Sequence, residues 1–391
     1  MQNFEYFTPT DVLFGRGTHL KIGEMLKKYG FQKIMLHYGG GSIKKNGIFE
    51  DVTKSLEDAG IEYVDFGGAE PNPKLSLVEK GAKICKEQNV ELVLAVGGGS
   101  AIDSAKEIAV GAKYEGSTWD FSSKLKEPED ALPIGVILTL SASGSEMSAS
   151  AVITNEENGL KRGYNHKLHR PLFAICNPEL TYTVDKFQTG CGIVDILMHT
   201  LERYFSDSPE TPLTDALAEA LLKQVVKAGR KAVDSPADYD ARATLMWASS
   251  LSHNDLTGCG RSVFLTCHQL EHELSGKYDF VAHGAGLSVI FPAWAFYVMR
   301  HNLPRFVQYA KNVWDIPEDK DHPEQTAYAG IQATKLFFAE IGMPVSLKEL
   351  GVGDEGFSEM ADKCTNYGER ILPGKLPLGK KEIIEIFELA K

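Results

Sequence analysis

Two pairs of side chains that could bind a metal ion share the same spacing in the second half of the sequence. Asp195 and His199 are four residues apart, and so are His268 and His272. Residues i and i+4 lie on one face of an α-helix, so each pair would face a single neighbour. His283, which opens the turn HGAG, follows His268 by 15 residues. One carboxylate and several imidazoles suit a divalent transition metal, Fe²⁺ or alternatively Zn²⁺ or Co²⁺.

For each of these histidines taken alone, the alternative is a structural role without a metal. A lone histidine is more often a satisfied core or surface residue than a metal ligand. The paired spacing, found twice in one helical region, favours a metal site, because a buried carboxylate or imidazole without a partner costs several kcal/mol, about 2–7 for a neutral polar group. Whether the two pairs meet in space depends on the fold.

A glycine-rich turn links an apolar strand-like run, residues 91–96, to a helix-like segment, residues 101–112. Glycines let a backbone turn tightly and approach an anion, and the positive end of the helix dipole would favour a pyrophosphate there. Ser100 is expected to cap the helix, with Asp103 at the capping-box spacing. A plain strand-to-helix turn would have the same composition. The candidate phosphate-binding residues are Gly97, Gly98, Gly99, Ser100 and Asp103.

Two further polar turns also follow strand-like runs. The first, Gly39, Gly40, Gly41 and Ser42, lacks the acidic residue that would bind a ribose 2′-hydroxyl, and it is followed by Lys44 and Lys45. A hydroxyl and cations there favour NADP over NAD, although a solvated turn with two surface lysines would look the same. The other turn, residues 139–146, carries hydroxyl groups that could line a nucleotide groove. They belong to Thr139, Ser141 and Ser145.

The elements that must position these residues divide into two kinds. Short apolar runs alternate with helix-length segments between residues 33 and 177, the pattern of βαβ units around a parallel sheet. Beyond residue 184 only helix-period segments occur, separated by prolines. We therefore predict an α/β domain over residues 1–184, which contains the candidate phosphate-binding turns, and an all-α domain over residues 185–391, which contains the candidate metal ligands.

Composition narrows the function classes. The chain of 391 residues has a formal net charge of −12, which argues against nucleic acid and against an anionic membrane surface as partners. The longest apolar stretch, residues 286–299, is interrupted by Pro292 and is too short to span a bilayer, so it predicts a buried helix. The N-terminus has no apolar core of a signal peptide, and the six cysteines form no C-x-x-C pair. These features predict a cytoplasmic protein.

Taken together, the motifs resemble a known family. The stretch GGGSAIDSAK, the D-x-x-x-H pair and the H-x-x-x-H…HG run resemble the iron-containing alcohol dehydrogenases, and YGGGSIKKNG, MHTLERYF and HGAGLSVIFPAW resemble their butanol dehydrogenase branch. The resemblance covers nearly the whole chain. It implies a Rossmann-like dinucleotide-binding domain and a helical domain in a dehydroquinate synthase-like architecture, with the active site in the cleft between them. It also implies a homodimer.

The resemblance assigns roles to individual positions. It implies that the metal ligands are Asp195, His199, His268 and His283, and that His272 lies near the nicotinamide without binding the metal. His272 is then the candidate catalytic residue that relays a proton. Lys161 falls where the family has a lysine close to the nicotinamide ribose. Gly97 to Ser100 and Asp103 fall on the pyrophosphate loop, and Thr139, Ser141 and Ser145 fall on the family's T-T-x-G-T-G-S-E segment.

The implied reaction is hydride transfer between NADP(H) and a small aliphatic aldehyde or alcohol such as butyraldehyde or butanol. A divalent metal would act as a Lewis acid on the carbonyl group. Phe264 and Trp247 are expected to line the substrate pocket. The alternatives are a metal- and NAD-dependent lyase of the dehydroquinate synthase type, and a nucleotide-binding sensor without catalysis. Only Arg261 and Lys277 near residues 253–283 could hold the phosphorylated, carboxylated substrate of such a lyase.

Overall fold

The computed structural model describes residues 1–208 and 210–391, and these form two compact units. The α/β unit contains Phe7–Val184 together with Ala237–Ser250. The helical unit contains Met1–Tyr6, Asp185–Pro236 and Leu251–Lys391. Residues 1–6 therefore belong to the helical unit, although the chain continues from them into the α/β unit. Residues 237–250 belong to the α/β unit, although the chain before and after them belongs to the helical unit.

The α/β unit is built on a six-stranded sheet in the order β1-β8-β5-β4-β2-β3, in which every neighbouring pair is parallel. The predicted parallel sheet is confirmed. Because β2 leads to β3 on one side and β4 leads to β5 on the other, the strand order reverses between β2 and β4. The strands are β1 (Asp11–Phe14), β2 (Lys33–Gly39), β3 (Glu62–Ala69), β4 (Leu92–Gly97), β5 (Ile134–Leu138) and β8 (Phe173–Cys176).

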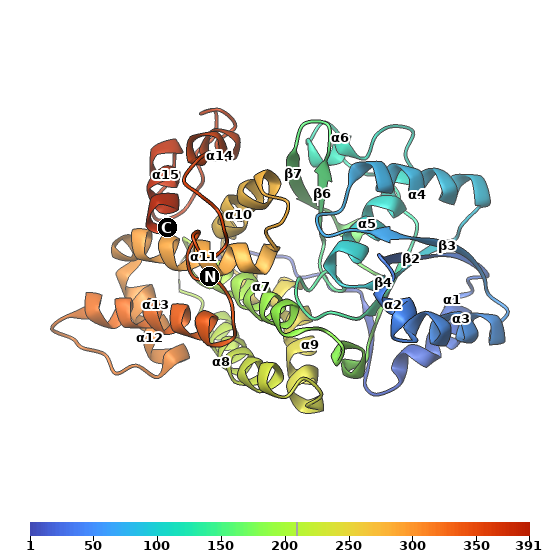
Figure 1. Cartoon of the computed structure of the whole chain (residues 1–391), viewed down its shortest axis with the longest axis horizontal. Coiled ribbons are helices and arrows are strands. Elements are labelled where there is room, and N and C mark those ends of the chain that lie inside the picture. The colour runs from blue at the N-terminus through green and yellow to red at the C-terminus, as the bar shows by residue number, and fades with distance from the viewer. Residues whose placement is uncertain (209) are drawn as a thin grey trace. The chain divides into compact units, whose positions relative to one another are not determined.

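Helices cover both faces of this sheet (Figure 1). Strand β4 is buried throughout, and its alternate side chains enter different cores, Val93 on one face and Leu92 and Leu94 on the other. This explains the continuous apolar run, which is typical of a strand buried on both faces. The helices of the unit are α1 (Ile22–Tyr29), α2 (Ser42–Lys45), α3 (Ile48–Asp58), α4 (Leu75–Gln88), α5 (Gly99–Gly111) and α6 (Trp119–Ser122), with 3₁₀ turns η1 (Thr18–Lys21), η2 (Lys167–His169) and η3 (Pro178–Thr181).

The sequence pattern missed one structural feature of the α/β unit. Strands β6 (Ser150–Asn155) and β7 (Leu160–Asn165) form an antiparallel two-stranded sheet separate from the main one. Their alternation is weak because β7 reads LKRGYN, with only a few apolar side chains. The helical segment that follows β2 is divided into α2 and α3, because Gly47 adopts a left-handed φ of 80° between them.

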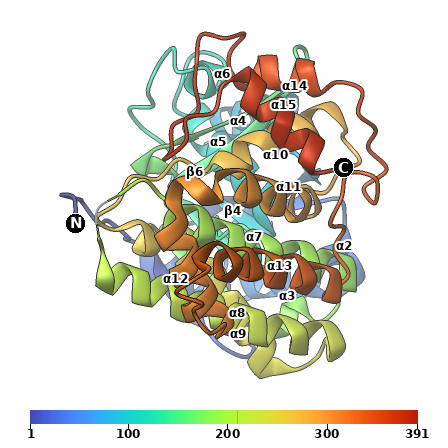
Figure 2. The ribbon, with the colours of Figure 1, turned by 90° about the vertical axis from the view of Figure 1, so that its left-hand side faces the viewer.

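The helical unit consists of α-helices and 3₁₀ turns, and among the described residues its one β feature is an isolated bridge between Leu372 and Leu378. Helices α12 and α13 lie side by side (Figure 2). The elements are α7 (Lys186–Tyr204), α8 (Pro212–Asp234), α9 (Tyr239–His253), which begins in the α/β unit, η4 (Leu256–Gly258), α10 (Thr266–Lys277), α11 (His283–Val298), η5 (Met299–Asn302), α12 (Leu303–Trp314), α13 (Pro323–Glu340), α14 (Phe357–Cys364) and α15 (Lys380–Leu389).

Helices α7 and α11 form the centre of the helical unit. Helix α7 begins at the Asp185 cap, whose side chain accepts a hydrogen bond from the Gln188 amide at 2.8 Å, and it is buried from Thr189 to its end. The predicted buried helix at residues 286–299 is confirmed as α11, which contains Pro292. No described helix combines the length and the apolar character that crossing a membrane would require.

Glycine allows α11 to approach the α7 backbone. A Cβ atom added at Gly284 would lie 2.2 Å from the carbonyl oxygen of Cys191. We expect Gly284→Ala to lower the free energy of unfolding of the helical unit by about 1–3 kcal/mol, because a backbone atom cannot move aside as a side chain can. Denaturant unfolding followed by tryptophan fluorescence measures this change. The control is Gly353→Ala, where an added Cβ meets nothing within 4 Å, and equal stability of both variants would contradict the packing argument.

Candidate active site and metal centre

Helix α7 places one carboxylate and one imidazole at the centre of the helical unit. The side chains of Asp195 and His199 project from successive turns, and Asp195 Oδ1 lies 3.4 Å from His199 Nδ1. Both residues are buried within an otherwise largely apolar helix. The His199 ring also stacks on that of His253 at the end of α9, with ring centroids 3.9 Å apart. Sequence reasoning did not connect His253 with this site, because it lacks a partner at helical spacing.

The other two predicted ligands come from different helices and converge on the same oxygen. His268, in the first turn of α10, places Nε2 3.5 Å from Asp195 Oδ1. His283, the first residue of α11, places Nε2 3.8 Å from the same atom. The structure therefore brings the four residues Asp195, His199, His268 and His283 together around one carboxylate oxygen, although they span 89 positions of the sequence.

The centre of this cluster contains polar atoms that lack hydrogen-bond partners. Among the described residues, no atom forms a hydrogen bond with buried Asp195 Oδ1, His199 Nδ1 or His268 Nε2. Leaving such groups unpaired costs about 1–3 kcal/mol each. Ligand atoms of these three residues lie within 4.8 Å of one another, and one carboxylate oxygen with imidazole nitrogens is a donor set that suits Fe²⁺, Zn²⁺ or Co²⁺. The residues present thus fit a divalent metal ion.

A second buried carboxylate, that of Glu202, contacts the ring nitrogen of His268 that is opposite to the one facing Asp195. It contacts His268 Nδ1 and the backbone amide of Cys267, and it accepts a further bond from the His268 amide at 3.1 Å. Burial lowers the pKa of His268, but the charge of Glu202 and the neighbouring Asp195 outweigh it and raise that pKa to about 9. Burial, with the charges of nearby histidines, holds the pKa of His199 well below its ordinary value. The two acidic side chains thus outweigh burial at His268, whereas burial dominates at His199.

Sequence reasoning missed Glu202, although a signal was present. It lies three residues after His199 on the same helix, so its side chain falls near the same face. An acidic residue in a segment that is otherwise mostly apolar needs a partner. The sequence could not show that this partner is His268, because α10 lies more than sixty positions further along the chain.

His272 lies next to this cluster. Its ring centroid is 5.5 Å from that of His283 and 6.5 Å from that of His268, and the side chain is partly exposed. Together with Glu271 and His283 it forms a second group of potential ligand atoms within 4.8 Å of one another. His283 belongs to both groups of potential ligands, because its Nε2 faces Asp195 and its Nδ1 contacts Glu271. The role of His272 in proton transfer stays a prediction.

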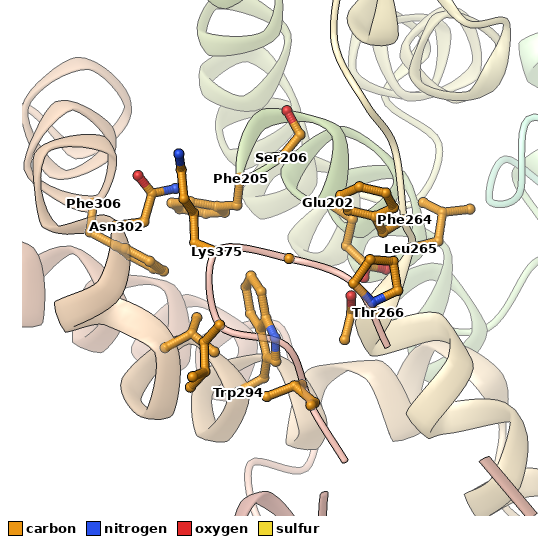
Figure 3. Close-up of a pocket in the computed structure, with 15 residues that line it drawn as sticks. Glu202, Phe205, Ser206, Phe264, Leu265, Thr266, Trp294, Asn302, Phe306 and Lys375 are labelled. Carbon is orange, nitrogen blue, oxygen red and sulfur yellow. The ribbon is translucent and has the colours of Figure 1, made fainter. Parts of the chain in front are cut away.

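The helical unit contains a pocket, and Glu202 is one of the residues that line it (Figure 3). None of the four predicted ligands is among its described lining residues, but Glu202, which contacts His268, is one of them. The expected substrate-contacting residue Phe264 lines this pocket. Trp247 belongs to the α/β unit and lies edge-on to Phe14, with ring centroids 6.2 Å apart. The other aromatic lining residues are Phe205, Trp294 and Phe306.

The three predicted cofactor turns follow neighbouring strands of the α/β unit. The first two turns begin at the last residues of β2 and β4, Gly39 and Gly97, and the third follows β5 from Thr139. Strands β2, β4 and β5 are adjacent in the sheet. In parallel sheets the carboxyl ends of the strands lie at one edge, and ligands bind there where the strand order reverses. The structure therefore brings the three turns to one edge, at the point between β2 and β4 where such a ligand is expected.

The glycines of the second turn are required by close approach. A Cβ at Gly98 would lie 3.0 Å from Leu140 Cβ, and one at Gly99 would lie 2.6 Å from Ser143 Oγ. The turn thus rests against the residues that follow β5. At the first turn, in contrast, a Cβ at Gly40 or Gly41 would meet nothing within 4 Å, so that turn faces open space. The hydroxyl of Ser141 is buried, and no described atom forms a hydrogen bond with it.

The predicted capping box at Ser100 is wrong. Helix α5 begins at Gly99, its cap is Gly98 with no side-chain hydrogen bond, and Ser100 lies inside the first turn. The Asp103 carboxylate instead accepts bonds from Ser145 Oγ at 2.6 Å and from the Val152 amide at 3.1 Å. It links α5 to the turn after β5 and to the β6–β7 sheet. Tertiary partners outcompete the local cap because the glycine turn starts the helix one residue early.

Two more predicted residues are placed by the same unit. Lys161, on β7, is buried and donates a hydrogen bond from Nζ to Asn72 Oδ1 at 2.9 Å. Lys44 is engaged by Asp65, a residue that sequence reasoning missed, with Nζ 3.3 Å from Oδ2. The other oxygen of Asp65 accepts a bond from the Tyr38 hydroxyl at 2.5 Å. An acidic side chain therefore does lie beside the first glycine turn, supplied by the neighbouring strand β3.

These features define a class of protein: an open parallel sheet with glycine turns where its strand order reverses, and a helical unit that holds a buried carboxylate–imidazole cluster. Comparison with known proteins gives the family. The model "Iron-containing alcohol dehydrogenase" matches residues 9–178, and "Fe-containing alcohol dehydrogenase family, C-terminal" matches residues 189–390. The chain belongs to the iron-containing alcohol dehydrogenase family and is an oxidoreductase with its dehydroquinate synthase-like fold. The resemblance predicted from the motifs is confirmed.

Relatives of known name are similar along the whole chain. NADH-dependent butanol dehydrogenase A of Clostridium acetobutylicum is 43% identical over 99% of both chains. The NADPH-dependent aldehyde reductase YqhD of Escherichia coli K12 is 34% identical over 94% of both. The crystal structure of NADH-dependent butanol dehydrogenase A from Thermotoga maritima has a TM-score of 0.96 at 40% identity and covers 100% of this chain and 99% of that one.

Removal of one cluster member tests the metal site. We expect His268→Ala to lower the bound divalent metal at least about tenfold, because the site loses a ligand and Glu202 loses its partner. Metal content per chain, measured by mass spectrometry of elements after loading and desalting, checks this. His301→Ala, at an exposed histidine of η5, is the control. A His268 variant that retains the wild-type metal content would rule out the assignment.

Proposed function

We propose that this protein is a metal-dependent alcohol dehydrogenase and aldehyde reductase that transfers a hydride between a nicotinamide cofactor and a small aliphatic aldehyde such as butyraldehyde. The observation that carries the proposal is the cluster of buried, unpaired donor atoms at Asp195, His199 and His268. The names of the relatives, butanol dehydrogenase and aldehyde reductase, support the substrate class. A homodimer is proposed on the family resemblance, and a reducing cytoplasm on the absence of paired cysteine spacings in the sequence.

Each unit has a separate task in this proposal. The α/β unit, which contains most of the predicted domain 1–184, binds the dinucleotide, and the helical unit, which contains most of the predicted domain 185–391, holds the metal. Asp195, His199, His268 and His283 would hold a divalent ion, which when bound supplies Lewis acidity for the carbonyl group. When they hold the ion, Asp195 would contribute negative charge and the imidazoles would bind it through neutral nitrogens, so together the residues would moderate the charge of the ion. His272, beside His283, moves a proton between solvent and the substrate oxygen.

The cofactor is held by the turns at the edge of the sheet. The amides of Gly97 to Ser100 and the start of α5, which has no side-chain cap, bind the pyrophosphate, because the first turn of a helix has N–H groups without intrahelical partners and lies at the positive end of the helix dipole. The buried Ser141 hydroxyl supplies a further polar contact. A net charge of −12 gives no overall attraction for an anion, so these local groups carry the binding. Gly39 to Ser42, Asp103, Thr139, Ser145 and Lys161 complete the proposed cofactor site.

The two cations that the lyase alternative would need for its substrate, Arg261 and Lys277, have other partners. Arg261 is buried, donates to Asp215 Oδ1 at 2.5 Å and donates to Thr211 Oγ1 at 2.8 Å. Lys277 contacts the carboxylate of Glu359. Both cations thus already serve structural contacts within the helical unit. A lyase acting on a phosphorylated, carboxylated substrate would need cations that are available to bind it.

The direct test is turnover. Purified protein loaded with Fe²⁺, Zn²⁺ or Co²⁺ is mixed with butyraldehyde and either NADH or NADPH, and the absorbance of the reduced nicotinamide is followed. We expect it to fall with at least one cofactor, and to stay constant when the metal has been removed. Oxidation of the cofactor by metal-free protein at the same rate would contradict the metal-dependent mechanism, and constant absorbance in every arm would contradict the proposed reaction.

Cofactor choice is the finer part of the proposal. The preference for NADPH rests on Ser42, Lys44 and Lys45, whereas the relatives at 43% and 42% identity are named NADH-dependent. Lys44 also lies over the rings of Tyr38 and Phe49, at 4.8 and 4.3 Å from their centroids, so its position is well defined. A ribose 2′-phosphate beside this turn would meet the cation of Lys44 and the carboxylate of Asp65 together.

Asp65 is therefore expected to weaken the binding of NADPH. We predict that Asp65→Asn raises the ratio of kcat/KM for NADPH to that for NADH about tenfold, equivalent to ~1.4 kcal/mol, because it removes a like charge from the 2′-phosphate. Lys44→Gln should lower the same ratio. Initial rates with both cofactors measure it. Glu62→Gln, at an exposed residue of the same strand, is the control, and an unchanged ratio in both test variants would exclude this turn from cofactor selection.

A further inference from the structure

Glu271 is a carboxylate in the core of the helical unit for which the proposed mechanism has no role. Its residue is 0% exposed, on helix α10 three positions after His268. One carboxylate oxygen contacts Nδ1 of His283. The opposite ring nitrogen of His283 faces Asp195 Oδ1 at 3.8 Å. A single imidazole therefore joins Glu271 to the centre of the cluster.

The structure makes room for this carboxylate by means of a glycine. A Cβ atom at Gly286 would lie 2.8 Å from Cγ and 2.9 Å from Oε1 of Glu271. Gly286 lies three residues after His283, so both belong to nearly the same face of α11. The two glycines of the HGAG turn thus have different tasks. Gly284 brings α11 against the backbone of α7, and Gly286 admits Glu271 beside His283.

The arrangement repeats at the second imidazole. Glu202 contacts Nδ1 of His268, whose Nε2 faces the same oxygen of Asp195. A carboxylate on the outer nitrogen fixes the orientation of an imidazole and makes its inner nitrogen a stronger electron donor. His283 has the greater need of this support, because its side chain is 27% exposed while that of His268 is 6% exposed.

We propose that Glu271 is a positioning residue: it holds the His283 ring with Nε2 toward Asp195 and thereby strengthens the binding of a divalent metal at the cluster. This inference rests on the proposed metal site and deepens it. Its effect acts on the metal through His283, and it is therefore measurable without turnover.

The test measures Co²⁺ binding to the full-length chain after removal of metal. Competition with a chelator gives the dissociation constant, and the visible spectrum of bound Co²⁺ reports the ligand geometry. We expect Glu271→Gln, which keeps the shape but removes the charge, to weaken binding about 10–100-fold and to alter the spectrum. Glu271→Asp, which restores the charge, should recover part of the affinity. The control is Glu273→Gln, at a buried glutamate two positions further on the same helix.

The possible outcomes are distinct. Equal Co²⁺ affinity and spectrum in wild type and Glu271→Gln, while His283→Ala binds weakly, would overturn the positioning role and leave the metal site standing. Two Co²⁺ ions per wild-type chain would instead indicate that Glu271, His272 and His283 ligate a second ion, which also overturns the proposal. A wild-type chain that binds no Co²⁺ would contradict the metal site itself. Should Glu271→Gln fail to fold, Gly286→Ala, which displaces the carboxylate without removing it, gives the same test.

Discussion

The interaction on which the helical unit depends is the burial of one carboxylate among imidazoles without enough hydrogen bonds to satisfy them. Oδ1 of Asp195 has three imidazole nitrogens at 3.4, 3.5 and 3.8 Å, and among the described atoms none forms a hydrogen bond with it. In a protein interior such groups are stable only when a charge compensates them. A divalent cation would supply this charge. The packing of helices α7, α10 and α11 therefore brings together the groups that a cation site requires.

Further residues around this site hold its imidazoles in place. Glu202 and Glu271 contact the outer nitrogens of two imidazoles, and each carboxylate is buried because a close approach of helices encloses it. That approach depends on small residues: Gly284 against the α7 backbone and Gly286 against Glu271. The glycines of the HGAG turn are thus a condition for the geometry of the cluster. In the α/β unit, Gly98 and Gly99 have the corresponding role, because they let the turn after β4 rest on the turn after β5.

The extent of prediction from sequence differed between parts of the molecule. Apolar runs such as that of β4 indicated the parallel sheet, since a strand buried on both faces has no polar side chains. The hairpin β6–β7 escaped notice because its second strand, LKRGYN, lacks a clear alternation. The cap expected at Ser100 fitted local rules, but Asp103 takes partners 42 and 49 positions away, and no local rule contains these. For the same reason Asp65 was missed beside Lys44, although the sequence contains both.

The sequence by itself determined the family, the parallel sheet, the helical second half and the identity of the candidate ligands, because these follow from local periodicity and from motifs such as D-x-x-x-H and HGAG. Only the tertiary structure decided that Asp195, His199, His268 and His283 share one oxygen, that Glu202 and Glu271 stand behind two of them, and that Asp65 engages Lys44. The physical reason is that spacing along one helix fixes which residues share a face, whereas contacts between helices and strands depend on how closely their backbones approach. In this chain that approach is set by glycines and by long-range packing.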